Sequence, residues 1–337
     1  MRQKLFRVSM VLGTGGAVAA AMLPGAQAAS AATPSWQPVL SVPGGGVTEA
    51  VVATGKTTGW AFLYDGAAYE RTGATTWKQV QFTGGDGYVT AAASSPSDVW
   101  AAFRPAVGSG SQVYRWTGTS WSVAKSFPGD VTGLSVLGPD DVWAFGGASG
   151  GGGVFHFNGH SWAEVSSTLP GGSATSDQDV WAYSGTQVAH YNGGKWTETS
   201  VAGLFPASTG GQAAPTLTGI LALAPDNVFA AGTSWGGAGG AGGGPAVVLH
   251  FNGHAWSLAA VGPDVLAPGS LASDGQGGLW MTSDTHENFE ELLHYSDGQL
   301  VSANEPFVSV ASIPGTAEAL GGNATGVATQ PVVYQYS

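Results

Sequence analysis

Apolar and polar residues alternate in short segments along this chain, and the segments recur in a fixed order. An apolar segment of the type Asp-Val-Trp-Ala, as at 141–144, is followed by an Asn-Gly turn and a second Trp, as at 158–162. The same pair recurs at 98–121, at 179–196 and, with Phe for the first Trp, at 227–256. Alternation over a few residues between turn signals predicts β-strands. A repeat of roughly 40–50 residues with this content predicts a β-propeller.

We assign four strands, a to d, to each repeat. Strand a is a run of small residues such as 131–137, strand b is the Asp-Val-Trp-Ala segment, strand c ends in Asn-Gly, and strand d opens with the second Trp. The Asn-Gly pairs predict tight hairpins because both residues tolerate φ > 0. Seven units can be assigned, although Leu300 replaces the second Trp in the sixth and the seventh lacks strand d.

The N-terminal segment 36–42 has the pattern of a d strand and follows no strands of its own. We expect it to complete the last blade, because this closes the ring and removes a sheet edge. The predicted fold is all-β: a seven-bladed β-propeller of four-stranded antiparallel blades, closed by an N-terminal outer strand in the last blade. Small residues suit the crowded axis, and Trp rings fill the wider gaps between diverging blades.

The first 28 residues have the features of a secretory signal peptide. A basic head precedes an apolar run over 8–22 and an Ala-x-Ala sequence at 26–28. The run is shorter than the ~20 apolar residues that a membrane helix needs. We therefore predict a signal peptide over 1–28, one propeller domain over 29–337, secretion to the extracellular space and no membrane insertion.

The amino-acid composition excludes several kinds of site and partner. The chain contains no cysteine, which excludes disulfides, thiolate nucleophiles and thiolate metal sites. Only 9% of the residues are charged, and the formal net charge is −12. Because an acidic protein repels phosphate backbones and anionic lipid, nucleic acid is not an expected partner. A cationic ligand or a neutral sugar is compatible with this negative net charge. We expect the protein to be a monomer.

The third unit carries a resemblance to a known repeat. Its segments 142–147 and 155–162, with a glycine pair, aromatics and a spaced Trp, resemble a kelch repeat. The Asp-Val-Trp-Ala form is similar to repeats of secreted actinobacterial propellers of the galactose-oxidase-like and sialidase-repeat-like kinds. The resemblance implies blades and no particular chemistry. Galactose-oxidase chemistry needs a copper site with a modified cysteine, and the sialidase Asp-box motif occurs nowhere in this chain.

Four histidines invite interpretation as metal ligands: His156, His190, His250 and His294. All four occupy the same position in strand c of their units. Equivalent positions of different blades lie far apart around a ring, so these side chains cannot meet on one ion. Arg115, Glu70 and Gln335 hold the same position in other units. We interpret the position as part of the blade structure and predict no metal site there.

We expect function where the repeat is broken. The b–c and d–a connections share one face of a propeller, and here they vary widely, as at 104–112, 202–215 and 233–245. Variable loops on a rigid scaffold are the usual layout of a binding site. The candidate ligand-binding residues are three aromatic and three acidic side chains: Trp235, Tyr88, Phe205, Asp86, Asp130 and Asp264. The acids, with backbone carbonyls, are also candidate Ca²⁺ ligands, whereas no catalytic residue and no required cofactor are predicted.

Three functions remain open. The first is an exported non-catalytic propeller that binds a carbohydrate or a protein through its variable loops. The second is a secreted polysaccharide hydrolase or lyase that uses loop carboxylates, with or without calcium. The third is a structural protein of the cell envelope. Propellers host many functions, so the fold does not choose among these.

Overall fold

A computed structural model describes residues 33–44, 46–82, 85–207, 214–235, 243–284, 290–324 and 332–337. Residues 34–337 form one compact unit. The predicted signal peptide lies outside the described residues. No helix within the described ranges is long and apolar enough to cross a membrane.

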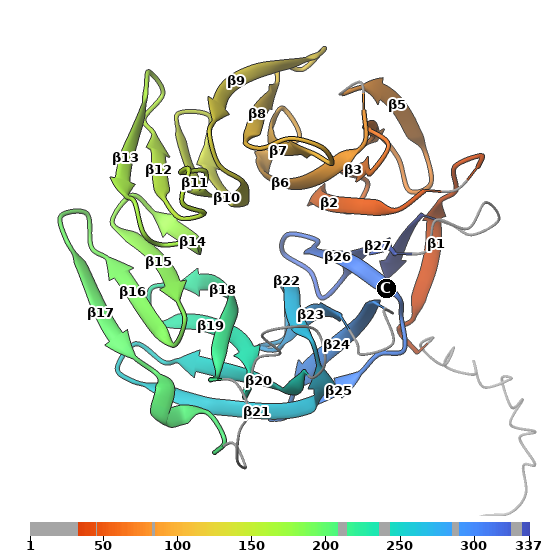
Figure 1. Cartoon of the computed structure of the whole chain (residues 1–337). Coiled ribbons are helices and arrows are strands. Elements are labelled where there is room, and N and C mark those ends of the chain that lie inside the picture. The colour runs from red at the N-terminus through yellow and green to blue at the C-terminus, as the bar shows by residue number, and fades with distance from the viewer. Residues whose placement is uncertain are drawn as a thin grey trace, which may run out of the picture. The chain divides into compact units, whose positions relative to one another are not determined.

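The compact unit consists of seven four-stranded antiparallel sheets, arranged as the blades of a ring (Figure 1). Blade 1 contains β2 (Thr48–Gly55), β3 (Thr58–Leu63), β4 (Ala67–Arg71) and β5 (Trp77–Gln81). Blade 2 contains β6 (Gly87–Ser95), β7 (Asp98–Pro105), β8 (Ser111–Trp116) and β9 (Trp121–Phe127). Blade 3 contains β10 (Val131–Gly138), β11 (Asp141–Gly146), β12 (Val154–Phe157) and β13 (Trp162–Ser166).

The remaining blades follow the same order. Blade 4 contains β14 (Gly171–Ser176), β15 (Asp179–Ser184), β16 (Gln187–Tyr191) and β17 (Trp196–Ser200). Blade 5 contains β18 (Thr216–Ala224), β19 (Asn227–Thr233), β20 (Gly244–Phe251) and β21 (Trp256–Val265). Blade 6 contains β22 (Ala267–Ser273), β23 (Leu279–Asp284), β24 (Glu290–Ser296) and β25 (Gln299–Ser302). Blade 7 contains β26 (Phe307–Ser312), β27 (Ala319–Asn323), β28 (Val333–Tyr336) and β1 (Trp36–Leu40).

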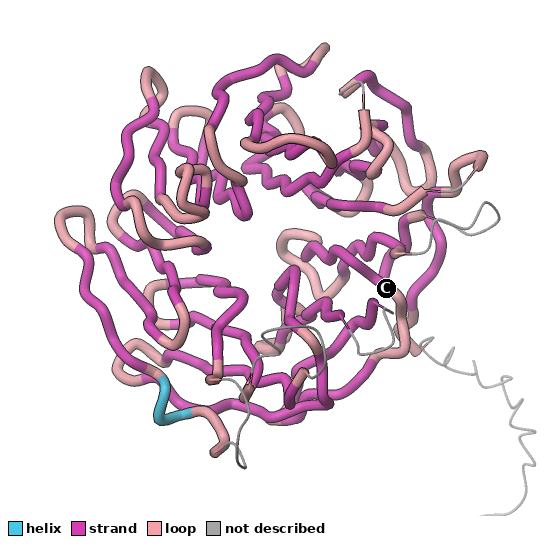
Figure 2. Tube along the Cα trace, in the orientation of Figure 1, coloured by secondary structure: helices cyan, strands magenta, loops and turns pink. Residues whose placement is uncertain are grey.

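Blade 7 joins the two ends of the ring. Strand β1 pairs antiparallel with β28, placing Trp36 opposite Tyr336 and Leu40 opposite Val333. The predicted fold class and the predicted closure by an N-terminal outer strand are therefore confirmed. In the described part of the chain, the helical structure is the short 3₁₀ turn η1 (Ala202–Leu204), which follows β17 (Figure 2).

The hydrophobic core is divided into seven layers, each between two neighbouring blades. The repeated tryptophans build these layers. Trp181 of β15, for example, contacts Phe251 and Trp256 of the next blade at ring-centroid distances of 5.0 and 5.8 Å. The sequence repeat is thus a repeat of aromatic contacts between blades, which explains why the second Trp opens each d strand of blades 1 to 5.

The Asn-Gly turns differ from the expected hairpin type. In the turn after β12, Gly159 has φ +85°, whereas Asn158 does not adopt positive φ. The Asn158 side chain instead accepts hydrogen bonds from the backbone N–H groups of His160 and Ser161, at 3.1 and 3.0 Å. This is the turn-capping role of asparagine, in which the side chain replaces a backbone acceptor.

The repeated histidines belong to the blades. His190 stacks on Trp181, with ring centroids 4.1 Å apart, and its Nε2 lies 2.8 Å from a carboxylate oxygen of Asp179. His156 and His294 repeat this arrangement, and His250 stacks on Phe229 and bonds to Asn227. The interpretation of this position as blade structure is confirmed.

Candidate binding site on the variable face

In every blade the antiparallel order a-b-c-d brings the b–c and d–a connections to one face of the ring, which we call the variable face. The other face carries the a–b and c–d turns. Tyr64 follows β3, and Tyr88 and Arg104 lie near the start of β6 and the end of β7. All three residues therefore lie at the variable face, on blades 1 and 2.

Tyr64, Tyr88 and Arg104 form a contiguous stack. The Tyr64 and Tyr88 rings meet edge to face, with centroids 5.5 Å apart. The Arg104 guanidinium carbon lies 4.0 Å from the centroid of Tyr88, a cation–π contact. The two residues are opposite each other in the β6–β7 pair. Tyr88 is 43% exposed, so the stack presents an aromatic and cationic surface to solvent.

Two predicted acids adjoin this stack. Asp130 lies 3.5 Å from the Nε of Arg104, and both side chains are partly exposed. The exposed Asp86 is held by its backbone carbonyl, which accepts a 2.9 Å hydrogen bond from the N–H of Ala106. Close approach requires glycine at position 87, because a Cβ there would sit 2.4 Å from the Arg104 carbonyl oxygen. The structure thus brings Tyr88, Asp86 and Asp130 together around Arg104.

A glutamate of strand a completes the cluster. Glu49 of β2 is half-buried, and burial raises its pKa to about 7, although Arg104 acts in the opposite direction. Burial of the ring, with nearby Tyr88, Asp86 and Glu49, also raises the pKa of Tyr64. Perturbed groups that converge at one surface are typical of functional sites.

We predict that Glu49→Gln changes how stability depends on pH. The free carboxyl titrates near 4.5 and the folded one near 7, so the folded protein retains a proton that the unfolded chain has released. Stability should therefore fall as pH rises through this window. Because solvent screens the partly exposed carboxylate, we expect Glu49→Gln to gain only about 1 kcal/mol above pH 7. Denaturant unfolding at pH values below 4.5 and above 7 measures the difference. Exposed Glu198→Gln is the control, and identical pH profiles for wild type and Glu49→Gln would contradict the prediction.

The other three predicted residues lie elsewhere. Trp235 and Asp264 belong to blade 5 and Phe205 to the connection between blades 4 and 5, across the ring from β6 (Figure 1). Phe205 is not the exposed loop aromatic that we expected: it is 8% exposed and packs in the core between these blades. The preceding η1 turn directs it inward.

Trp235 and Asp264 also differ from the expectation. The Trp235 indole lies over Gly244 of β20, where an added Cβ would come within 2.7 Å of the ring. The half-buried ring therefore folds back onto its own blade. Asp264 is exposed but lies within β21, paired with Pro245, and not in a loop.

Three members of the cluster were missed by the sequence analysis: Tyr64, Arg104 and Glu49. A signal for one of them exists. Glu49 and Tyr88 occupy the same second position of neighbouring a strands, where blades 3 and 4 have Thr132 and Gly172. Two large polar side chains in neighbouring blades, at a position where the next two blades have small residues, mark a departure from the repeat.

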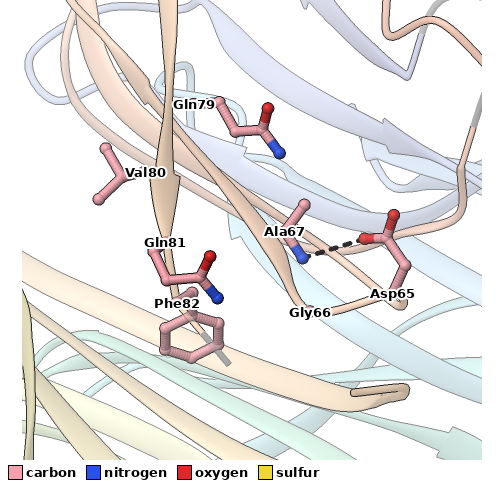
Figure 3. Close-up of a pocket in the computed structure, with 7 residues that line it drawn as sticks. All are labelled: Asp65, Gly66, Ala67, Gln79, Val80, Gln81 and Phe82. Carbon is pink, nitrogen blue, oxygen red and sulfur yellow. Dashed lines mark hydrogen bonds between the residues drawn. The ribbon is translucent and has the colours of Figure 1, made fainter. Parts of the chain in front are cut away.

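A pocket of about 460 Å³ lies along β4 and β5, the outer strands of blade 1 (Figure 3). Asp65, directly after Tyr64, accepts a 3.0 Å hydrogen bond from the N–H of Ala67 and shapes the rim. The side chains of Gln79 and Gln81 and the ring of Phe82 are drawn along the same pocket. The pocket lining thus combines two amide side chains with one aromatic ring.

Metal binding has little geometric support in the described ranges. No three His, Cys, Asp or Glu side chains gather there in a way that could hold an ion. Of the three acids proposed as Ca²⁺ ligands, Asp264 lies within β21 of blade 5, away from the other two, and Asp130 lies 3.5 Å from the guanidinium of Arg104.

The fold has many relatives among solved structures. A structure of YCF48 bound to D1 peptide aligns with a TM-score of 0.57 and 13% identity, covering 89% of this chain and 96% of that one. The WD40 β-propeller domain of Doa1 aligns at 0.62 with 11% identity over 90% and 97% of the two chains. A streptogramin B lyase aligns at 0.59 with 12% identity over 90% and 97%.

These similarities define the class of the molecule: it is a β-propeller with seven four-stranded blades. Identities this low show the fold alone. The sequence matches no protein-family model and no curated protein. Since propellers include both binding proteins and enzymes, the function must be argued from the cluster on the variable face.

Proposed function

We propose that this chain is an exported, non-catalytic protein that binds a partner protein through the variable face, at Tyr64, Tyr88 and Arg104. The observation that carries the proposal is the exposed stack of two tyrosines and one arginine. Tyrosine and arginine are enriched among the residues that dominate the energy of protein interfaces. They supply large contact areas and several hydrogen bonds while few rotatable bonds are immobilised.

The charge of the cluster and a structurally similar propeller indicate the kind of partner. Three acidic residues, Glu49, Asp86 and Asp130, belong to the cluster with one arginine, and the formal net charge of the chain is −12. A partner segment with basic side chains fits this surface. That a structurally similar propeller, YCF48, is bound to a peptide supports a peptide segment as the element recognised.

Selection from a displayed random peptide library tests the proposal. We expect the purified protein to select peptides enriched in Lys and Arg. Tyr88→Ala and Arg104→Ala should each weaken their binding by about 2 kcal/mol, or roughly thirtyfold. Leu258→Ala is the matched control, since Leu258 is 41% exposed, similar to Tyr88, but lies on β21 of blade 5. Peptides that bind wild type and the Tyr88 and Arg104 variants equally well would show that the cluster is not the binding site.

A glycoside hydrolase is the second candidate, and one observation favours it. A carboxyl group with its pKa raised to about 7, near other carboxylates, has the properties of a general acid. Release of reducing sugar from a panel of polysaccharides tests this function. If it occurs through Glu49, Glu49→Gln abolishes it.

A further inference from the structure

A second concave site lies between blades 4 and 5, far from the Tyr88 cluster. It is a groove of about 510 Å³ along β17, the outer strand of blade 4. Thr197 and Thr199 of β17 line one side, and Phe251 and Trp256 of blade 5 line the other. Strands β17 and β21 lie on the outside of the ring, so the groove opens at its rim (Figure 1).

The outer strand of blade 4 is more polar on this side than the outer strands of blades 1 and 3. Three residues after the d-strand Trp, blades 1 and 3 have Val80 and Val165, which pack against the layers between blades. Blade 4 has Thr199 there and Thr197 two residues earlier, and both threonines are exposed. Alternation along a strand places both side chains on the same side of the sheet. The Thr199 hydroxyl therefore lies where blades 1 and 3 place a valine, and Thr197 adds a second hydroxyl on the same side.

The opposite wall combines aromatic rings with a polar group. The rings of Phe251 and Trp256 are half-buried and lie 5.5 Å apart, inclined by 38°. In blades 1 to 4 the indole N–H of the d-strand Trp is buried without a hydrogen-bond partner, but that of Trp256 is not among these buried groups. The wall thus offers ring surface and a donor that is not sealed in the core.

The lining is electrically neutral apart from two imidazoles, because no Asp, Glu, Lys or Arg is among the residues described around the groove. The first imidazole, His190, is already bonded to Asp179 through Nε2. The second, His254, is exposed in the c–d turn of blade 5. A charged ligand would find no counterion here, so the groove suits a neutral one.

We infer that this groove is a saccharide-binding site. The apolar C–H face of a sugar ring packs on Trp256 and Phe251, and its hydroxyl groups exchange hydrogen bonds with Thr197 and Thr199. A volume of about 510 Å³ lies within the range of small-molecule sites. A purely apolar ligand would leave the two hydroxyls unpaired on burial, which is unfavourable. The site is independent of the proposed protein-binding function, because it uses other blades and other residues.

Titration of the purified protein with cellohexaose, chitohexaose and maltohexaose, by calorimetry and saturation-transfer NMR, tests the inference. We expect at least one of the three to bind. Thr199→Val, which keeps the shape but removes the hydroxyl, should weaken binding about fivefold, and Trp256→Ala about tenfold or more, equivalent to about 1.4 kcal/mol. Glu198→Gln, on the same strand but the opposite side, should leave binding unchanged.

Two outcomes would overturn the inference: none of the three oligosaccharides binds, or one binds and Thr199→Val retains the full affinity. If Trp256→Ala lowers the stability of the fold, the binding measured for Thr199→Val alone decides whether the inference holds. This substitution is exposed and isosteric, so it leaves the layer between blades 4 and 5 intact. Neither outcome bears on the peptide selection at Tyr88 and Arg104, so the two proposals fail separately.

Discussion

Deletion of residues 33–42 should lower the free energy of unfolding by more than about 5 kcal/mol. This segment contains β1, the outer strand of blade 7. Loss of a buried Trp or Leu side chain alone costs about 2–5 kcal/mol, and both Trp36 and Leu40 pack in layers of the ring. The Trp36 ring contacts Phe307 at 4.8 Å and Trp280 at 5.5 Å, and it therefore bridges blades 7 and 6.

Guanidinium unfolding followed by circular dichroism measures this effect, since the deletion also removes one fluorophore. The control is a variant that lacks only residues 1–32 and keeps β1, which should unfold at the same denaturant concentration as the full chain. A protein without 33–42 that unfolds together with this control would refute the closure of the ring by β1. The expected loss is large because the deletion also exposes the hydrogen-bonding edge of β28.

The fold could be predicted from the sequence because blades 1 to 5 repeat the same pattern of strands and turns. Trp121, Trp162 and Trp196 each mark the first residue of a d strand, and the unpaired N-terminal strand had one empty place to occupy. The Asn-Gly turns were located correctly but assigned the wrong geometry. The sequence shows that a turn occurs, whereas the two hydrogen bonds that the Asn158 side chain accepts from backbone N–H groups depend on the four-residue loop that joins the strands.

The candidate site was only partly predictable. Tyr88 and Asp130 could be selected because they stand at breaks in the repeat, but Arg104 joins them only through the pairing of β6 with β7 and the proximity of blade 3. Phe205 is the opposite case, a residue that was selected from the sequence but does not belong to the site. A loop aromatic looks exposed in the sequence, yet it reaches the layer between blades 4 and 5 because η1 turns the chain. Such contacts depend on how the blades pack in three dimensions, which a local sequence pattern does not reveal.

The repeated aspartate at the start of strand b should contribute very different amounts to the free energy of unfolding in different blades. In blade 4, Asp179 is 4% exposed and accepts hydrogen bonds from the Trp181 indole at 2.9 Å, from His190 and from the hydroxyl of Thr175. Its removal leaves the buried indole N–H of Trp181, and the partly buried donors of His190 and Thr175, without this acceptor. Breaking a buried charged network in this way costs about 3–5 kcal/mol, so we expect Asp179→Ala to be among the most damaging single substitutions in the chain.

Asp141, at the same position in blade 3, provides the matched comparison. Its side chain is 35% exposed and bonds to His156, while the indole N–H of Trp143 already lacks a partner. Leu137 holds the place of Thr175 and cannot donate a hydrogen bond. We therefore expect Asp141→Ala to cost only about 1 kcal/mol. Denaturant unfolding of both variants gives the two values directly. Equal losses of stability in the two variants would mean that the burial of Asp179 and its hydrogen bonds to Trp181 and Thr175 add nothing to the stability of the blade.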